Sequence, residues 1–157
     1  MIKEKKRSAL IWLIPLVLLV VIYFSFGLSM VSGPSLEPTL HDGETVIIRK
    51  ALANQYYHRG DIAVIAPSKQ ADTYLIKRII AIGGDTVTIQ DGKVFVNGKA
   101  VNEVYLTQDI FTEGNEEEIS VPQGSIYLLG DNREESVDSR ELGLFSQDDI
   151  FGIILWK

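Results

Sequence analysis

The chain has 157 residues and no cysteine, which suits one folded domain and excludes disulfides, thiol catalysis and cysteine-ligated metal. Its formal net charge is -6, but the first seven residues carry +3, so the remainder carries -9. An acidic folded part argues against nucleic acid as a partner.

A run of 20 uncharged residues, Ala9–Leu28, follows the basic N-terminus. At about 1.5 Å per residue, a helix of this length crosses a hydrocarbon core of ~30 Å. Because basic residues precede the run, we expect a cytoplasmic tail at 1–7, a single transmembrane anchor at 8–28 and an extracytoplasmic domain at 29–157. The alternative is a cleaved signal peptide, whose apolar region is normally only about 7 to 15 residues long.

Several later segments are rich in β-branched residues and end at turn-forming residues, which is typical of strands. They are Thr45–Ala51, Asp61–Ala66, Thr73–Ile82, Thr86–Gln90, Lys93–Val101, Ser125–Leu129 and Gly152–Lys157. The pairs Asp91-Gly92 and Asn97-Gly98 favour two-residue hairpin turns, which need positive φ at both positions. The sequence therefore predicts a mainly antiparallel β domain, whose only short helix lies around Ser146–Ile150.

The stretch Ser32–Leu40, SGPSLEPTL, is a stiff turn shortly after the uncharged run. Pro34 and Pro38 restrict φ on either side of Ser35, and Gly33 permits a close backbone approach. Such a turn can fix a serine hydroxyl and its backbone N–H for attack on a carbonyl.

A nucleophilic serine needs a base, and the chain offers histidine or lysine. His41 and His58 are the only histidines, and both lie in polar turns that suit surface residues. Lys77 is flanked by apolar residues, and burial lowers the pKa of an amine so that it can accept a proton. Period-2 geometry puts Lys77 and Arg78 on opposite faces of a strand. For Lys77, the alternative is a charge at the edge or surface of a sheet.

A third polar segment, GDNREESVDSRELG at Gly130–Gly143, follows an apolar strand. Its density of short polar groups suits a hydrogen-bonded loop, and a solvated connection is the alternative.

Four motifs follow the expected anchor in order along the chain. They are SGPSLEPTL, RGDIAV at Arg59–Val64, YLIKRIIAIGGD at Tyr74–Asp85 and the polar segment Gly130–Gly143. This set closely resembles the compact, Gram-positive form of the type I signal peptidases. These are membrane-anchored Ser/Lys serine endopeptidases, with a mostly antiparallel β fold, that remove signal peptides from exported preproteins.

The resemblance implies a role for each matching residue. Ser35 is the nucleophile, Lys77 the general base, and Ser136 the serine that hydrogen-bonds the lysine amine. Leu36 and Ile76 match positions that line pockets for small substrate side chains. A supporting ionic network is implied for Asp131, Arg133, Asp138 and Arg140.

One expected oxyanion donor is the Ser35 backbone N–H. Some relatives supply a second donor from a side-chain hydroxyl two residues before the nucleophile, but Gly33 occupies that place, which leaves Ser32 as a substitute. No cofactor or metal is implied. The implied partners are secretory preproteins with small residues before the cleavage site and the lipid bilayer.

Two other functions fit parts of this pattern. A self-cleaving Ser/Lys protein of the repressor type shares the chemistry, although the expected anchor and the lack of a DNA-binding helical domain weigh against it. A non-catalytic, membrane-tethered β module would make the serine turn and Lys77 purely structural.

Overall fold

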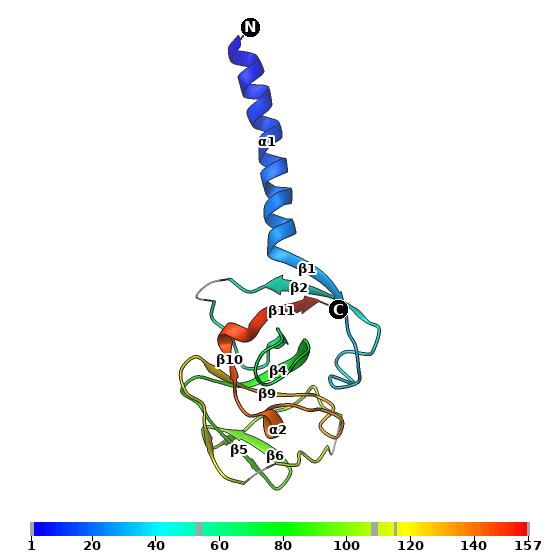
Figure 1. Ribbon diagram of the computed structural model, residues 1–157, viewed down its shortest axis with the longest axis vertical. Helices are drawn as coiled ribbons and strands as arrows, with labels where there is room; N and C mark the ends of the chain where they lie inside the picture. The colour runs from blue at the N-terminus through cyan, green and yellow to red at the C-terminus, as the bar shows by residue number, and fades with distance from the viewer. Residues whose placement is uncertain (1, 53–54, 108–109, 115, 157) are drawn as a thin grey trace.

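The computed structural model describes residues 2–52, 55–107, 110–114 and 116–156. A long N-terminal helix, α1 (Ile2–Ser25), projects from a β domain that holds the rest of the chain (Figure 1). Among the described residues, no helix is both long enough and apolar enough to cross a membrane.

Helix α1 ends before the expected anchor does. Strand β1 (Phe26–Met30) follows it and pairs antiparallel with β2 (Thr45–Lys50), with Gly27 opposite Ile48. Glycine and serine are poor helix formers, and pairing with β2 satisfies the backbone groups of β1. The last three residues of the predicted segment 8–28 therefore belong to the edge of a sheet.

Two antiparallel sheets make up the β domain. The larger has the order β1-β2-β11-β3-β4-β9-β10 and the smaller β7-β6-β5-β8. The remaining strands of the larger sheet are β3 (Ile62–Ile65), β4 (Leu75–Ile82), β9 (Ser125–Leu129), β10 (Phe145–Ser146) and β11 (Ile150–Trp156). The smaller sheet consists of β5 (Thr86–Gln90), β6 (Lys93–Val96), β7 (Lys99–Ala100) and β8 (Ile119–Ser120). The predicted mainly antiparallel β fold is confirmed.

The predicted hairpin turns are confirmed by their backbone angles. Asp91 and Gly92 have φ of 50° and 74°, and Asn97 and Gly98 have φ of 53° and 70°. Each pair connects neighbouring strands of the smaller sheet, β5 with β6 and β6 with β7.

The expectation of one short helix was incomplete. The 3₁₀ helix η1 (Gln147–Asp149) lies where it was predicted, and the Ser146 hydroxyl caps it by accepting a hydrogen bond from the Asp148 N–H. A second helix, α2 (Ser139–Leu142), begins inside the polar segment after β9. Its N-cap is Asp138, whose carboxylate accepts from the Arg140 N–H. The polar residues of that stretch had favoured only a hydrogen-bonded loop, so the prediction of a single short helix was wrong.

The core explains why β4 and β9 do not alternate between apolar and polar residues. Ile79 and Leu128 pack in one buried apolar cluster, while the next residues along each strand, Ile80 and Leu129, pack in another. Both faces of these strands are therefore buried, which favours continuous apolar runs. A third cluster, including Leu36, Ile48 and Val64, lies beneath the serine turn.

Candidate active site

The loop that carries Ser35 connects β1 with β2 and is closed at its base by backbone hydrogen bonds. The Val31 N–H donates to the Glu44 carbonyl at 2.8 Å, and the Gly43 N–H donates to the Val31 carbonyl at 2.9 Å. Within the loop, the Gly33 N–H donates to the Asp42 carboxylate at 2.8 Å. Gly33 has a φ of +88°, which residues with a Cβ rarely adopt. The loop therefore holds Ser35 in a defined, half-buried position.

The main chain of Ser35 is attached to the segment after β9. Its carbonyl accepts from the Asn132 N–H at 3.1 Å, whereas its own N–H donates to no acceptor among the described residues. A Cβ at Gly130 would collide with both the Ser35 carbonyl and the Ser136 hydroxyl. Glycine at 130 therefore lets these two groups approach one another.

Lys77 lies in β4 and is only 3% exposed. Burial, the largest cause, lowers the pKa of its amine from 10.5 to about 8. The Arg140 charge acts in the same direction, and the carboxylates of Asp138 and Asp131 oppose it. No carboxylate within the described part of the chain forms an ion pair with Lys77. At pH 7 such an amine is neutral in about a tenth of the molecules, which suits a general base.

Ser35 and Lys77 line the same groove, which has a volume of about 530 Å³. Ser32 and residues of β1 line it together with Tyr74 and residues of β4, and β2, β11 and β3 lie between these two strands in the sheet. Aliphatic and aromatic side chains make up much of the remaining wall, namely those of Ile48, Val64, Leu75, Ile76 and Phe151. A groove between two strands that holds both a serine and a buried amine can bind an extended peptide and act on its backbone.

Comparison with known proteins agrees with this geometry. The family model described as "Signal peptidase, peptidase S26" matches residues 5–156. The chain belongs to the signal peptidase I family.

Individual relatives support the same assignment. Signal peptidase I P of Bacillus subtilis subsp. natto is 37% identical over 164 residues, which cover 95% of this chain and 88% of the relative. Signal peptidase I S of Bacillus subtilis (strain 168) is 36% identical over 167 residues, with coverage of 95% and 88%. The crystal structure of a signal peptidase I from Enterococcus faecalis V583 matches with a TM-score of 0.53 and 27% identity, over 64% of this chain and 98% of that one. The chain is thus a serine endopeptidase that removes signal peptides from preproteins.

Behind the groove of this signal peptidase, Arg78 occupies the centre of an ionic network. Its guanidinium donates to both carboxylate oxygens of Asp131, at 2.8 and 2.6 Å, and to the Gly60 carbonyl at 2.8 Å. It also donates to the Thr39 hydroxyl at 3.3 Å, which connects β4 to the end of the serine loop. The Tyr105 ring covers its face, with the guanidinium carbon 3.8 Å from the ring centroid. Arg78 therefore joins four loops around the site.

Sequence reasoning missed the residues that complete this network. Arg133 is held by Glu103 and Thr112 and donates to the Gly130 carbonyl at 3.1 Å. Glu103 also accepts a hydrogen bond from the Tyr105 hydroxyl at 2.8 Å. Burial and the nearby Glu103 charge raise the pKa of Tyr105 above its usual range. The stretch Asn102–Leu106, NEVYL, was the available signal, since it places a single acidic residue two positions before an aromatic one.

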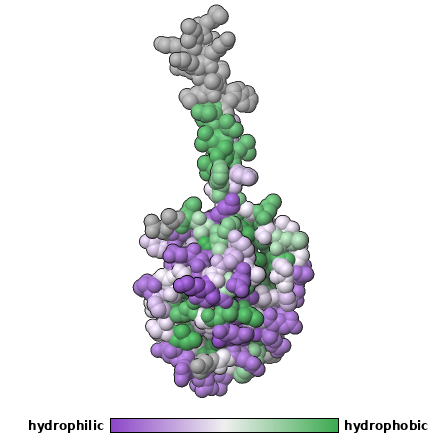
Figure 2. Space-filling view, in the orientation of Figure 1, coloured by the Kyte–Doolittle hydropathy of each residue, from purple (hydrophilic) through white to green (hydrophobic). Residues whose placement is uncertain are grey.

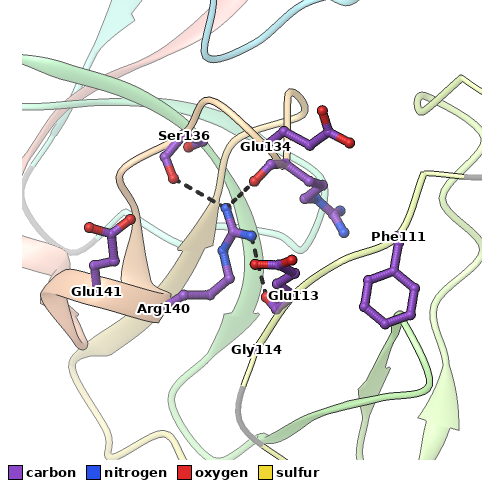
Figure 3. Close-up of a pocket in the computed structure, with 8 residues that line it drawn as sticks. Phe111, Glu113, Gly114, Glu134, Ser136, Arg140 and Glu141 are labelled. Atoms are coloured by element: carbon purple, nitrogen blue, oxygen red, sulfur yellow. Dashed lines mark hydrogen bonds between the residues drawn. The ribbon is translucent and has the colours of Figure 1, made fainter.

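The last pair of the predicted network joins Asp138 to Arg140 next to Ser136. Arg140 binds both Asp138 oxygens, at 2.8 and 2.9 Å, and donates to the carbonyls of Arg133, Ser136 and Glu113. Figure 3 shows this guanidinium directed at these carbonyls, in a cavity of about 490 Å³. The four predicted residues Asp131, Arg133, Asp138 and Arg140 are thus brought together, each in a charged pair.

The remaining predicted site residues differ in their positions. Ser32 and Ile76 line the groove. Leu36 is 1% exposed and packs behind the groove against Ile48 and Val64, which form part of its wall. Ser136 is buried, and its hydroxyl has no hydrogen-bond partner among the described residues, so the predicted bond to the Lys77 amine is not formed.

The histidine alternative gains no support. The side chains of His41 and His58 are 65% and 81% exposed, beside Glu37 and Asp61 respectively. Neither histidine lines the groove that holds Ser35.

Proposed function

We propose that this signal peptidase uses Ser35 as its nucleophile and Lys77 as its general base. The observation that carries the proposal is that both residues line one groove and that Lys77 is buried, with a pKa lowered to about 8. An amine with this pKa is neutral often enough to accept the serine proton near neutral pH.

The reaction begins with attack of the Ser35 Oγ on the carbonyl carbon of the scissile bond. The Lys77 amine takes the hydroxyl proton and passes it to the leaving amine as the C–N bond breaks, leaving an acyl-enzyme. The neutral Lys77 then takes a proton from water, whose oxygen attacks the ester, and it gives that proton to the Ser35 oxygen as the ester C–O bond breaks. Substrate in the groove displaces water, so burial of Lys77 increases and its pKa falls further on binding.

Two further groups complete the proposed chemistry. The free N–H of Ser35 is available to the oxyanion, and Ser32 is the candidate for a second donor. The unpaired Ser136 hydroxyl is available to orient the Lys77 amine once substrate is bound. Charged side chains of the network, which are already paired, hold these groups in position and take no part in proton transfer.

The groove also supports a preference for small side chains before the cleaved bond. Its walls include Ile48, Val64 and Ile76, and Leu36 packs behind the first two of these. Packed aliphatic side chains of this kind leave little room for large substituents and offer no partner to polar ones. The proposed substrates are therefore preproteins with small, uncharged residues at these positions.

We further propose that α1, from residue 8 to its end at Ser25, anchors the enzyme in the cell membrane, with residues 1–7 in the cytoplasm and the β domain outside it. Most of the described side chains of α1, including those of Leu16, Leu19 and Phe24, are apolar and exposed. Figure 2 draws them as an apolar stalk that stands clear of the β domain. Protection of the N-terminus and cleavage of the domain by external protease, in intact cells, would test this topology.

Cleavage of a precursor tests the catalytic assignment. The detergent-solubilised chain is incubated with a preprotein, and the N-terminus of the product is determined. We expect Ser35→Ala and Lys77→Ala, each confirmed folded by circular dichroism, to lose cleavage, because each removes a group that no neighbour replaces. The matched controls His41→Ala and His58→Ala should cleave like the wild type. A folded Lys77→Ala variant that cleaves at the normal rate would refute the assignment.

The pH profile tests the base by a second route. The acid limb of kcat/KM should report a pKa near the value of about 8 that burial gives Lys77. Activity should fall below this pH because the amine becomes charged. An acid limb centred near 6 would instead indicate a histidine.

A further inference from the structure

The groove contains a second lysine that the proposed mechanism does not use. Lys50 is the last residue of β2 and lines the same groove as Ser35 and Lys77. It lies opposite Gly152 in the sheet, and its Cε lies 3.6 Å from the point where a Cβ on Gly27 would be. Because both neighbours lack a side chain, the stem of Lys50 has room beside the groove.

The ammonium group of Lys50 has no ion-pair partner in the described part of the chain. Lys50 and Lys77 are the only charged residues among those described along the groove, and no carboxylate is present there. This contrasts with the net charge of -9 on the chain after its first seven residues. An otherwise acidic protein therefore has a positively charged groove, in which basic and acidic substrate side chains meet different potentials.

Lys50 lies on the side of the groove next to β1, and Lys77 lies three strands away in the order β2-β11-β3-β4. Gly27, beside Lys50, is the second residue of β1 and lies next to the end of α1. Ser35 is eight residues further along the chain, in the loop beyond β1. If α1 anchors the enzyme, the apolar segment of a signal peptide reaches the groove from the end at Gly27. The substrate residues that meet Lys50 are then those that precede the cleaved bond.

We propose that Lys50 is a specificity-determining residue that disfavours basic side chains, and favours acidic ones, in the substrate segment preceding the cleaved bond. This proposal rests on the proposed function, because it takes the groove to be the peptide site. Two like charges a few ångströms apart repel each other even where water screens them. Basic residues shortly before the cleaved bond are thereby disfavoured in the groove, so that an uncharged or acidic segment is presented to Ser35.

A charge scan of peptide substrates tests the proposal. The probes are one uncharged signal-peptide-derived peptide and versions of it that carry Lys, Gln or Glu at each position from the third to the eighth before the cleaved bond. Cleavage is measured as kcat/KM with the full chain in a neutral detergent. The readout is the ratio of the Lys to the Gln peptide within each enzyme variant, so a general loss of activity cancels.

We expect the wild type to cleave the Lys peptide about fivefold more slowly than the Gln peptide at one or two adjacent positions. This penalty should disappear in Lys50→Met and become a preference in Lys50→Glu. In the wild type it should also shrink at high ionic strength. The matched control Lys93→Met removes an exposed lysine of β6 in the smaller sheet, and should keep the wild-type ratios.

Other outcomes would overturn the proposal. If the Lys-to-Gln ratio of kcat/KM is the same in the wild type and in Lys50→Met, Lys50 is not the residue that discriminates by charge. The same conclusion would follow if the Lys peptide were cleaved more slowly to the same extent at every position. A charge preference seen only with anionic lipid vesicles would assign Lys50 to the membrane surface instead. If the wild type fails to cut the uncharged peptide, the proposed function fails as well. If all variants cut it and the charge preference is absent, only the role of Lys50 fails.

Discussion

Lys77 and Arg78 are adjacent in β4, and both are buried, yet their surroundings differ completely. Lys77 faces the groove without an ion-pair partner among the described residues, and burial lowers the pKa of its amine to about 8. Arg78 faces the other side, where Asp131, the Gly60 carbonyl and the Tyr105 ring surround its guanidinium. Strand alternation separates the two environments by one residue.

The difference shows two ways of burying a cation. A buried cation is tolerated when it is paired and hydrogen-bonded. A buried amine without a partner instead loses its proton more readily, so its pKa falls. Arginine cannot lose its proton in a protein, so it belongs on the paired side. Lysine on the unpaired side provides a base, at a cost in stability. The free energy of unfolding of the full chain, measured by urea denaturation in mild detergent, distinguishes the two cases.

The largest loss is expected for Arg78→Met. This change keeps much of the apolar stem but leaves the Asp131 carboxylate, which is 1% exposed, without its partner. Removing one member of a buried ion pair typically costs about 3–5 kcal/mol. In the double variant Arg78→Met/Asp131→Asn, most of that loss should be recovered because no unpaired charge remains.

Arg59→Met provides the matched control for this loss. Arg59 also pairs with a buried carboxylate, that of Asp85, but its own side chain is 48% exposed. Burial would raise the pKa of Asp85, yet hydrogen bonds from Arg59, the Ile82 N–H and Asn97 lower it overall. Because two of these partners remain, we expect a loss of about 1 kcal/mol. Equal losses in Arg59→Met and Arg78→Met would mean that burial does not distinguish the two pairs.

Lys77→Met is expected to raise the free energy of unfolding, whereas Arg78→Met and Arg59→Met lower it. Burial lowers the pKa of Lys77 from 10.5 to about 8, so below pH 8 the folded state holds a charged amine that it disfavours. The corresponding cost at pH 7 is about 3 kcal/mol, and Lys77→Met should be more stable than the wild type by up to that amount while being inactive. From pH 8 to 10.5 the unfolded chain binds more protons at this site than the folded one, so wild-type stability rises with pH.

Measurements at pH 7 and pH 10 separate this effect from simple repacking. The advantage of Lys77→Met should fall to about 1 kcal/mol at pH 10, because the folded wild type is then neutral at Lys77. An advantage that is the same at both pH values would come from packing. A Lys77→Met variant less stable than the wild type at pH 7 would contradict the idea that the amine is buried at a cost.

Local patterns indicated one half of the comparison, although for Lys77 they left a position at the edge or surface of the sheet open. The apolar neighbours of Lys77 indicated burial, and period-2 alternation separated it from Arg78. The hairpins at Asp91-Gly92 and Asn97-Gly98 followed from the positive φ that their turns require. Each of these predictions depends on residues that are close in sequence.

The partners on the other half could not be predicted in this way. Tyr105 and Glu103 are 27 and 25 residues after Arg78, in a loop with no periodic pattern. Asp42, which accepts from the Gly33 N–H, lies nine residues further along the chain in a turn that no motif marks. The first three residues of β1 lie in an uncharged run that suits a helix. Their strand conformation depends on pairing with β2, which the local sequence does not reveal. Contacts between residues far apart in the sequence therefore account for the parts of the fold and site that local patterns did not predict.

Tyr105→Leu tests the smaller contacts around Arg78. It removes both the ring that covers the guanidinium and the hydroxyl bond to Glu103, whereas Tyr105→Phe removes only the hydroxyl bond. We expect losses of about 2–3 kcal/mol for Leu and about 1 kcal/mol for Phe, because a desolvated cation–π contact contributes up to about 2 kcal/mol. In an Arg78→Met background, the difference in free energy of unfolding between Tyr105→Leu and Tyr105→Phe should shrink. If that difference is unchanged, the Tyr105 ring stabilises the protein by packing alone.

The smallest change in stability is expected for Ser136→Ala. The Ser136 hydroxyl is buried without a partner, so its removal should leave the free energy of unfolding unchanged or raise it by up to about 1 kcal/mol. Activity should respond differently. If the hydroxyl binds the Lys77 amine only when substrate fills the groove, kcat falls and the acid limb of its pH profile shifts, while stability does not. A loss of 1 kcal/mol or more on replacing Ser136 would show that its hydroxyl is already bonded in the free enzyme.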